Sequence, residues 1–355
     1  MKTILQLTKE AARYKGFYVG AIIATLLLTG VNLVAPRVLS KATGTISDGI
    51  DSSDYQKMMW MALILLGLYL LRVLFRFLNN YLAHKAAWEL VGDLRQRLYE
   101  KMQAMDLGFF HDKQTGDLMS RVVNDTREFE LLYAHIIPEM ISNVITFVGV
   151  LTILLFINWR LALLTCCPIP LILVSGVIFA KVVRPYFKAS QAVMGELNAL
   201  LQDDLSGMHE IQAFGQQKEE AAKMRKANDK QVVAMLKALR TSAIFHPTVE
   251  FISSVGTVLV ILFGGIMAVK FHLSVEDIVS FILYLSLFYA PVSGLAQLLE
   301  NLQQALAGGE RVSLILNTPS KIVDAEDATD LENIQGAVSF EHVKFSYEEE
   351  TPVLK

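Results

Sequence analysis

The sequence has little charge and almost no cysteine. Only 19% of its 355 residues are Asp, Glu, Lys or Arg, whereas soluble domains carry about 25%. The two cysteines, Cys166 and Cys167, are adjacent within an apolar run, which excludes a disulfide framework and favours small apolar fillers. A net charge of −3 gives no basic excess for binding nucleic acid. With 53% hydrophobic residues, this composition predicts a membrane protein.

The sequence also lacks the common patterns of catalytic and metal chemistry. Its seven histidines are scattered and include no His-x-x-x-His pair, so the sequence indicates no metal site. It contains no G-x-x-x-x-G-K-[ST] phosphate loop. We therefore expect no catalytic residue in this chain, no ATP hydrolysis by this chain alone, and no cofactor bound by it alone.

Long apolar runs are abundant instead. Crossing about 30 Å of hydrocarbon takes about 20 helical residues. Six stretches reach that length, provided that the second tolerates Arg72 and Arg76. We predict an all-α membrane protein whose six transmembrane helices lie at about 16–36, 58–83, 138–159, 161–182, 246–269 and 277–299.

The distribution of Lys and Arg predicts the orientation of these spans. Both residues gather before the first span, between the second and third, and between the fourth and fifth. Because positive residues favour the cytoplasmic side, both termini and the two long connections are expected there. Residues 1–15 combine an apolar helical face with several Lys and Arg, which predicts an interfacial elbow helix.

The two long connections have the periodicity of amphipathic helices, so the spans should continue as cytoplasmic helical hairpins. Each hairpin should be interrupted at its tip, and the third and fourth spans should meet in a tight external turn at 158–161. The first predicted apolar face comprises Trp88, Val91, Leu94, Leu98, Met102 and Met105. The second comprises Val193, Leu197, Leu201, Leu205, Met208 and Ile211.

The end of the chain has a different pattern. Residues 319–336 are largely polar, which predicts a linker. In residues 337–355 apolar and polar side chains alternate, which predicts a short β fragment. The alternation changes phase near Glu341–His342, which predicts a bulge or bend. Since a lone hairpin is unstable in water, we expect this fragment to be the leading edge of a domain that continues past the last residue.

Four segments together carry a specific resemblance. The stretches FFHDKQTGDLMSRVVNDT, DLSGMHEIQAFGQQKEE, ALAGGERVSLILNTP and VSFEHVKFSY occur in that order. They resemble the first and second intracellular loops, the exit from span six and the start of the nucleotide-binding domain of ATP-binding cassette (ABC) exporters. The chain thus looks like a half-transporter of the multidrug or lipid type, with residues 16–318 as its transmembrane domain and a truncated motor domain.

The resemblance implies partners and site residues. A working unit of twelve spans implies a second exporter subunit, identical or different, among the lipids of a plasma or inner membrane. The full-length protein would use ATP and Mg²⁺, with Tyr347 stacking on adenine unless it only fills a strand core. Coupling helices near 110–116 and 200–207 would dock on nucleotide-binding domains. The coupling residues implied are Phe110, His111, Asp112, Thr115, Gly116, Leu200, Asp203, Asp204 and Gly207.

Charged residues inside the spans are candidates for a substrate cavity, and helix-breaking residues are candidates for a hinge. A buried arginine is costly in a bilayer, so each must face protein, water or the interface. Arg72, Arg76, Glu139 and Glu250 are expected at similar depth, either as a cavity site for anionic head groups or as snorkelling and ion-paired groups. In span six, Pro291 and Gly294 would form a hinge or be ordinary tolerated residues.

Three functions fit these observations. The favoured one is the translocation domain of an ATP-driven exporter of drugs or lipids, working by alternating access. A six-span sensor that couples to a cytoplasmic partner is the alternative from another class. A peptide exporter of the same family is disfavoured, because only about 15 residues precede the first span.

Overall fold

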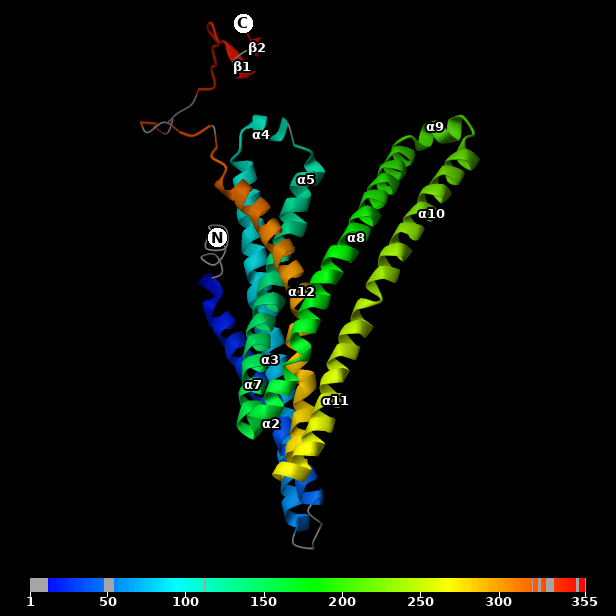
Figure 1. Ribbon diagram of the computed structural model, residues 1–355. Helices are drawn as coiled ribbons and strands as arrows, with labels where there is room; N and C mark the ends of the chain where they lie inside the picture. Colours follow the sequence, from blue (N-terminus) through cyan, green and yellow to red (C-terminus); the bar gives the residue numbers. More distant parts are fainter. Residues whose placement is uncertain are drawn as a thin grey trace. The chain divides into compact units, whose positions relative to one another are not determined.

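The computed structural model describes residues 12–47, 54–111, 113–320, 322–324, 327–329, 335–348 and 351–354. Long helices account for most of this range, as Figure 1 shows. The helices with 18 or more residues are α2 (Lys15–Ser47), α3 (Asp54–Gln103), α7 (Ile137–Thr165), α8 (Pro168–Ser206), α10 (Gln217–Ser242), α11 (Phe245–Phe271) and α12 (Val275–Asn317).

Short elements connect the long helices. They are η1 (Ala12–Tyr14), α4 (Leu107–His111), α5 (Thr115–Ser120), η2 (Arg121–Asp125), α6 (Thr126–Glu130), η3 (Leu131–Ile136) and α9 (Met208–Ala213). Of these, η1 is a 3₁₀-helix, whereas η2 and η3 are π-helical. Most of the predicted elbow helix, residues 1–11, lies outside the described residues.

The described residues contain six helical segments that are long and apolar enough to cross a membrane. Each predicted span falls within one or two of these segments, so the prediction of a six-span membrane protein is confirmed. The second span lies in α3, which runs for 50 residues without interruption. At 1.5 Å per residue α3 is about 75 Å long, more than twice the hydrocarbon thickness.

The chain divides into two compact units, of which one comprises Met1–Ala21, Asn80–Ile137 and Asn301–Lys355. Its core includes one face of α3, formed by Ala83, Ala86, Ala87, Leu90, Val91, Leu94 and Leu98. The predicted face is confirmed for Val91, Leu94 and Leu98 of α3 and for Met105 just beyond its end, whereas Met102 is half-buried and Trp88 is 47% exposed. The smaller side chain of Ala87 is buried instead.

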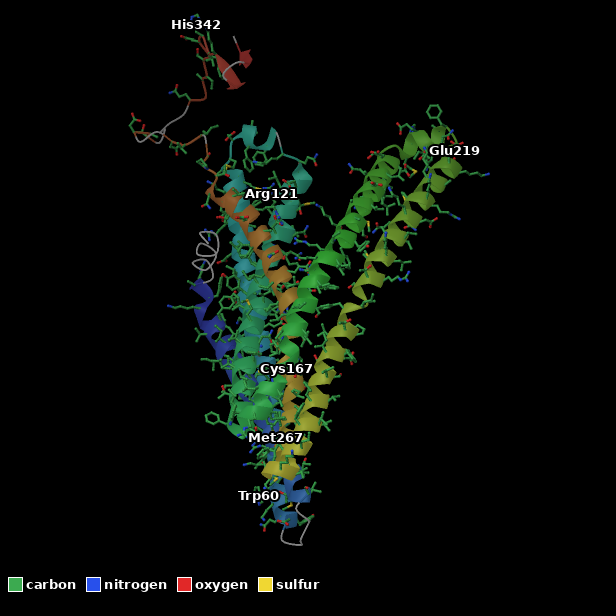
Figure 2. All side chains as sticks on the ribbon, in the orientation of Figure 1. Trp60, Arg121, Cys167, Glu219, Met267 and His342 are labelled. Carbon is green, nitrogen blue, oxygen red and sulfur yellow. The ribbon has the colours of Figure 1, made fainter. Side chains whose placement is uncertain are left out.

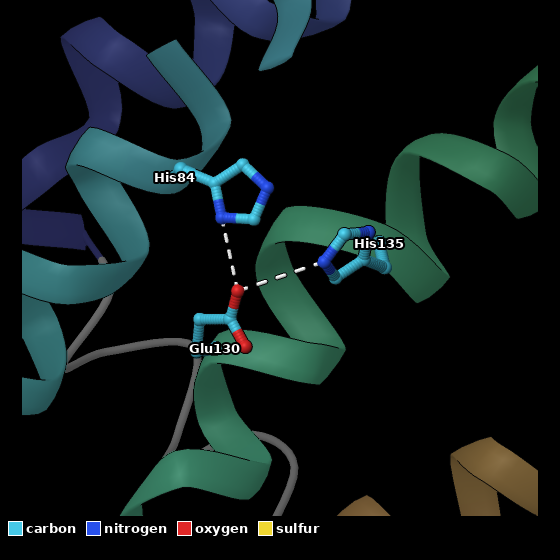
Figure 3. Close-up of side chains that lie close together, drawn as sticks. All are labelled: His84, Glu130 and His135. Carbon is cyan, nitrogen blue, oxygen red and sulfur yellow. Dashed lines mark ion pairs between the residues drawn. The ribbon is translucent and has the colours of Figure 1, made fainter. Parts of the chain in front are cut away.

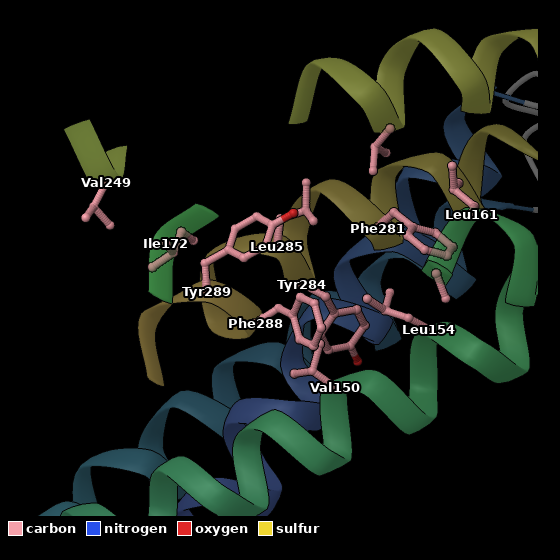
Figure 4. Packing of buried hydrophobic residues seen from close by; sticks show 12 residues of the cluster. Val150, Leu154, Leu161, Ile172, Val249, Phe281, Tyr284, Leu285, Phe288 and Tyr289 are labelled. Atoms are coloured by element: carbon pink, nitrogen blue, oxygen red, sulfur yellow. The ribbon is translucent and has the colours of Figure 1, made fainter. Parts of the chain in front are cut away.

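The other unit comprises Ile22–Asn79 and Pro138–Glu300. Figure 4 shows its core, in which side chains of α7, α8, α11 and α12 pack together. Phe147 and Phe288 stack with ring centroids 5.0 Å apart. Near the start of α12, the Arg37 guanidinium donates to the Ser280 hydroxyl over 2.9 Å and pairs with the Glu276 carboxylate over 3.4 Å.

Two breaks interrupt the region predicted as spans three and four. The tight turn expected at 158–161 is confirmed, because Asn158 has non-helical angles and its Oδ1 accepts from the Leu161 N–H over 3.1 Å. The helix also breaks at Cys166–Cys167, within the predicted fourth span at about 161–182. Pro168 follows at once, and its ring cannot continue the α-helical hydrogen bonding.

Helices α8 and α10 form the second hairpin. Lys230 of α10 pairs with Glu196 of α8 over 2.5 Å, and Gln231 donates to Ser190 over 3.4 Å. The apolar face predicted here is wrong in part, because Leu201 is 43% exposed and Leu205 is 62% exposed.

Strands β1 (Phe345–Glu348) and β2 (Thr351–Leu354) form an antiparallel pair. The bend predicted near Glu341–His342 is confirmed, because His342 has a φ of 51° and marks a bend before β1. Tyr347 lies in β1, but the described part of the chain excludes its side chain, so its stacking role stays a prediction. The domain boundaries predicted from sequence also stay predictions.

Candidate functional site

The tip of the first hairpin contains two short helices. The coupling helix predicted near 110–116 overlaps both short helices, because α4 covers Leu107–His111 and α5 begins at Thr115. Gln114 between them is extended, and the Asp106 carboxylate accepts from the Phe109 N–H over 3.2 Å at the start of α4. An aspartate that caps the first turn favours a helix start here rather than at Phe110.

Aromatic side chains mark this tip. The rings of Phe109 and Phe110 meet edge to face with centroids 5.2 Å apart, and Lys113 lies 3.4 Å over the Phe109 ring. Phe110 is 38% exposed, and Thr115 and Gly116 are also exposed. The side chain of His111 and the whole of Asp112 lie outside the described residues. An apolar pair held at an exposed tip is suited to contact another protein surface.

The tip of the second hairpin is displaced from its predicted position. Residues 200–206 belong to the last turns of α8, and the separate short helix is α9 (Met208–Ala213). Gly207 ends α8 by donating its N–H to the Asp203 carbonyl over 2.8 Å, and Gly215 follows α9 with a φ of 65°. Leu200 and Asp204 are half-buried, whereas Phe214 is 77% exposed.

The charged residues predicted as a cavity site are not joined by ion pairs. Arg72, Arg76, Glu139 and Glu250 are all exposed in the structure. Among the residues that the structure describes, no ion pair links any two of them. Their grouping as one site therefore stays a prediction.

A basic hollow lies on α8 and was missed at the sequence level. It has a volume of about 380 Å³ and is lined by Ala180, Lys181, Arg184, Pro185 and Lys188. The three basic residues recur at steps of three and four, so they share one face of the helix. They also lie at the predicted cytoplasmic end of the fourth span. That helical periodicity was the sequence signal that could have revealed the hollow.

Arg311 of α12 is held by Asp125 of η2, and sequence reasoning did not find this pair. The guanidinium donates from Nε over 2.7 Å and from Nη2 over 2.6 Å to the two carboxylate oxygens. These hydrogen bonds raise the pKa of Arg311, which lies beyond the last predicted span. Arg95 supports the same π-helix by donating to the Val123 carbonyl over 3.1 Å.

Gly308, in the segment ALAGGERV, lies at a close contact between α12 and α6. A Cβ added at Gly308 would lie 2.9 Å from the Glu128 Cγ and 3.4 Å from the Asp125 carbonyl oxygen. This approach is tighter than ordinary van der Waals contact, so the absence of a side chain lets α12 approach α6 closely.

The predicted hinge residues lie within α12. Pro291 stands inside this helix, and a Cβ at Gly294 would meet no atom within 4 Å. Two residues before Pro291, the Tyr289 hydroxyl donates to the Thr165 carbonyl over 2.8 Å. Thr165 is the last residue of α7, so Tyr289 satisfies a carbonyl freed by the break at Cys166–Cys167. Figure 2 labels Cys167 at this break.

Comparison with known proteins places these features in a family. Residues 18–292 match the family described as ABC transporter transmembrane region. The chain is 28% identical over 327 residues to an ATP-dependent lipid A-core flippase of Syntrophus aciditrophicus, covering 91% of this chain and 54% of that protein. It is 30% identical over 329 residues to a fatty acid ABC transporter ATP-binding/permease protein of Mycobacterium bovis, covering 93% and 50%.

A third relative is an uncharacterized ABC transporter ATP-binding protein of Bacillus subtilis, 25% identical over 334 residues, covering 94% of this chain and 55% of that protein. The chain therefore spans about half the length of these curated relatives. These relatives are similar to the chain along nearly all of its length, including both hairpins.

Proposed function

Because the chain belongs to the family of ABC transporter transmembrane regions, we propose that it forms the translocation path of an ATP-driven exporter for amphipathic lipids. The observation that carries the proposal is the match over 18–292 to that family, together with six helices able to cross a membrane. Relatives described as a lipid A-core flippase and as a fatty acid transporter favour lipid substrates over other amphipathic compounds.

The basic hollow on α8 supports a lipid with an anionic head group. Lys181, Arg184 and Lys188 line it at the predicted cytoplasmic end of the fourth span. Basic pockets at this level of a membrane protein suit phosphate-bearing head groups. Arg72 and Arg76, two exposed cations four residues apart in α3, would meet head groups that enter the translocation path.

Coupling to a motor domain completes the proposal. The exposed aromatic tips near Phe110 and Phe214 would rest on nucleotide-binding domains, one of them on the domain of a second subunit. Uninterrupted helices such as α3 would transmit movement along their length, and Pro291 with Gly294 would let α12 bend. ATP and Mg²⁺ would be held by the motor domain, to which Tyr347 would contribute its aromatic ring.

The direct test is transport by the full-length protein in proteoliposomes. We expect ATP to drive translocation of a fluorescent phospholipid or glycolipid, and the Arg72→Glu variant to alter lipid preference while the fold is retained. Unchanged transport of every substrate in that variant would remove Arg72 from the path. ATP hydrolysis without movement of any lipid or drug tested would overturn the proposed function.

A six-span sensor that acts on a cytoplasmic partner is the alternative. It predicts no net lipid movement, whereas an exporter predicts movement that stops when ATP hydrolysis is blocked. The same proteoliposome assay therefore separates the two functions.

A further inference from the structure

Two histidines and a glutamate from different parts of the chain converge in the first unit. His84 lies in α3, Glu130 ends α6, and His135 lies in the π-helix η3. Figure 3 shows both imidazole rings directed at the Glu130 carboxylate. The sequence gives no sign of this cluster, because His84 is distant in the chain and Glu130 is five residues from His135.

The π-helix brings Glu130 and His135 to the same side. In an α-helix, residues five apart project about 140° away from each other. A π-helix forms i→i+5 hydrogen bonds, so residues five apart stack nearly one turn above each other. The π-helix η3 covers Leu131–Ile136. Glu130 and His135 therefore lie about one turn apart and on the same side of the chain. Such π-helical insertions recur at functional sites.

Two of the three distances between the ligand atoms lie near the spacing found in a tetrahedral zinc site. Glu130 Oε1 lies 2.9 Å from His84 Nδ1 and 3.6 Å from His135 Nε2. Zinc binds imidazole nitrogen and carboxylate oxygen at about 2.0–2.2 Å, so tetrahedral ligand atoms lie about 3.3 Å apart. These two distances lie on either side of that value, and all three ligand atoms lie within 4.8 Å of one another.

Among the residues that the structure describes, the Glu130 carboxylate has no ion pair with Lys or Arg. Its side chain is only 13% exposed, and in the part of the chain that the structure describes its ion pairs are with His84 and His135 alone. These imidazoles are charged only when protonated, so with neutral imidazoles the carboxylate charge is uncompensated. A divalent cation would supply that charge, and a buried charge is otherwise costly.

We propose that His84, Glu130 and His135 bind a divalent transition metal, with Zn²⁺ as the best match, and leave a fourth position for water. Two imidazoles with one carboxylate form a zinc donor set, whereas Ca²⁺ and Mg²⁺ prefer oxygen ligands alone. His135 is 50% exposed and His84 is 39% exposed, so an ion reaches the site from solvent. The bound metal crosslinks α3, through His84, to the α6–η3 segment, through Glu130 and His135. This proposal is independent of the transport substrate.

The test is Zn²⁺ titration by calorimetry of the full-length protein in lipid nanodiscs. Cys166→Ala and Cys167→Ala form the background, so that thiols do not bind the ion. We expect one ion per protomer at the cluster, with affinity reduced at least about 10- to 100-fold in Glu130→Gln and in His135→Ala. The control is His209→Ala in α9, an exposed histidine outside the cluster that should leave affinity unchanged.

A second readout keeps the test valid if a variant folds poorly. Cobalt bound by the unmodified cluster should show the intense visible absorption of tetrahedral Co²⁺, and zinc should displace it. Zinc should also raise the Tm of the background protein and not that of Glu130→Gln. Absence of binding in the background protein, or equal affinity in Glu130→Gln and His209→Ala, would show a hydrogen-bonded cluster only and overturn the proposal.

Discussion

Arg311 and Asp125 are joined by two parallel hydrogen bonds of 2.7 and 2.6 Å, although 186 residues separate them in the chain. The Asp125 side chain is only 9% exposed, so this arginine fixes the end of α12 to a π-helix through a largely buried carboxylate. Bidentate pairs of this kind give both strength and a defined geometry.

Removing this pair should destabilise the first unit. Asp125→Asn removes the carboxylate charge and one acceptor, so we expect the free energy of unfolding to fall by about 1.5–3 kcal/mol, toward the lower end because Arg311 is 46% exposed. Thermal unfolding of the purified protein measures this loss. Glu196→Gln breaks the exposed Lys230–Glu196 pair and should change Tm far less. Equal effects in the two variants would contradict the role of Arg311.

A side chain at Gly308 should prevent α12 from approaching α6. The added Cβ of Gly308→Ala would meet Glu128 Cγ at 2.9 Å, and Gly308→Val would add two methyl groups there. Overpacking of this kind costs about 1–3 kcal/mol, so we expect a lower Tm, more so for valine. Gly195→Ala is the matched control, because a Cβ there meets no atom within 4 Å. A Gly308→Val protein as stable as the control would refute this packing.

Tyr289→Phe should lower the stability of the protein, because it removes the hydrogen bond to the carbonyl that the break at Cys166–Cys167 leaves free. The phenylalanine keeps the ring but leaves the Thr165 carbonyl without its hydroxyl donor, and a buried unsatisfied group costs about 1–3 kcal/mol. Differential scanning calorimetry should show a lower Tm. Tyr55→Phe removes a hydroxyl from a residue that is 74% exposed and should leave Tm unchanged. A decrease in Tm of the same size in both variants would show that the hydrogen bond between Tyr289 and Thr165 does not stabilise the protein.

Neutralising the basic hollow should weaken binding of anionic lipid. The variant Lys181→Gln/Arg184→Gln removes two of the three cations that line it. Each cation near an anionic surface contributes about 1 kcal/mol, so we expect affinity for a phosphate-bearing lipid to fall by about 10-fold or more. Native mass spectrometry with defined lipids measures the bound fraction. Lys226→Gln is the control, being outside the hollow, and equal losses in both proteins would indicate general surface electrostatics.

Part of the fold was predictable because the cytoplasmic half predicted for α3 buries a periodic stripe. Val91, Leu94 and Leu98 recur at helical spacing and are buried as expected. Trp88 was assigned to the same face because periodicity does not distinguish the centre of a stripe from its edge. Pro168 was a sequence signal for the break, because proline has no backbone N–H and its ring clashes with the preceding helical turn. The signal was overlooked because Pro168 lies within a long apolar run.

The contacts of the candidate sites were less predictable. A π-helix has no established sequence signature of the kind that caps and turns provide, so the meeting of Glu130 with His135 could not be anticipated from α-helical spacing. The partner of Arg311 could not be identified either, because pairing over 186 residues depends on tertiary packing. The short helices at the two tips lie a few residues from the positions predicted for coupling helices, because the capping by Asp106 and the αL glycine at Gly215 were not recognised.

In the proposed function, both hairpins extend into the cytoplasm, where a motor domain can act on them. Single cysteines at Leu107 and Phe214, which are 76% and 77% exposed, mark the two tips, and Tyr55, 74% exposed, marks a predicted external connection. In a protein without Cys166 and Cys167, a membrane-impermeant maleimide should label Leu107→Cys and Phe214→Cys only in inside-out vesicles, and Tyr55→Cys only in right-side-out vesicles. Labelling of either tip from outside the cell would contradict the claim.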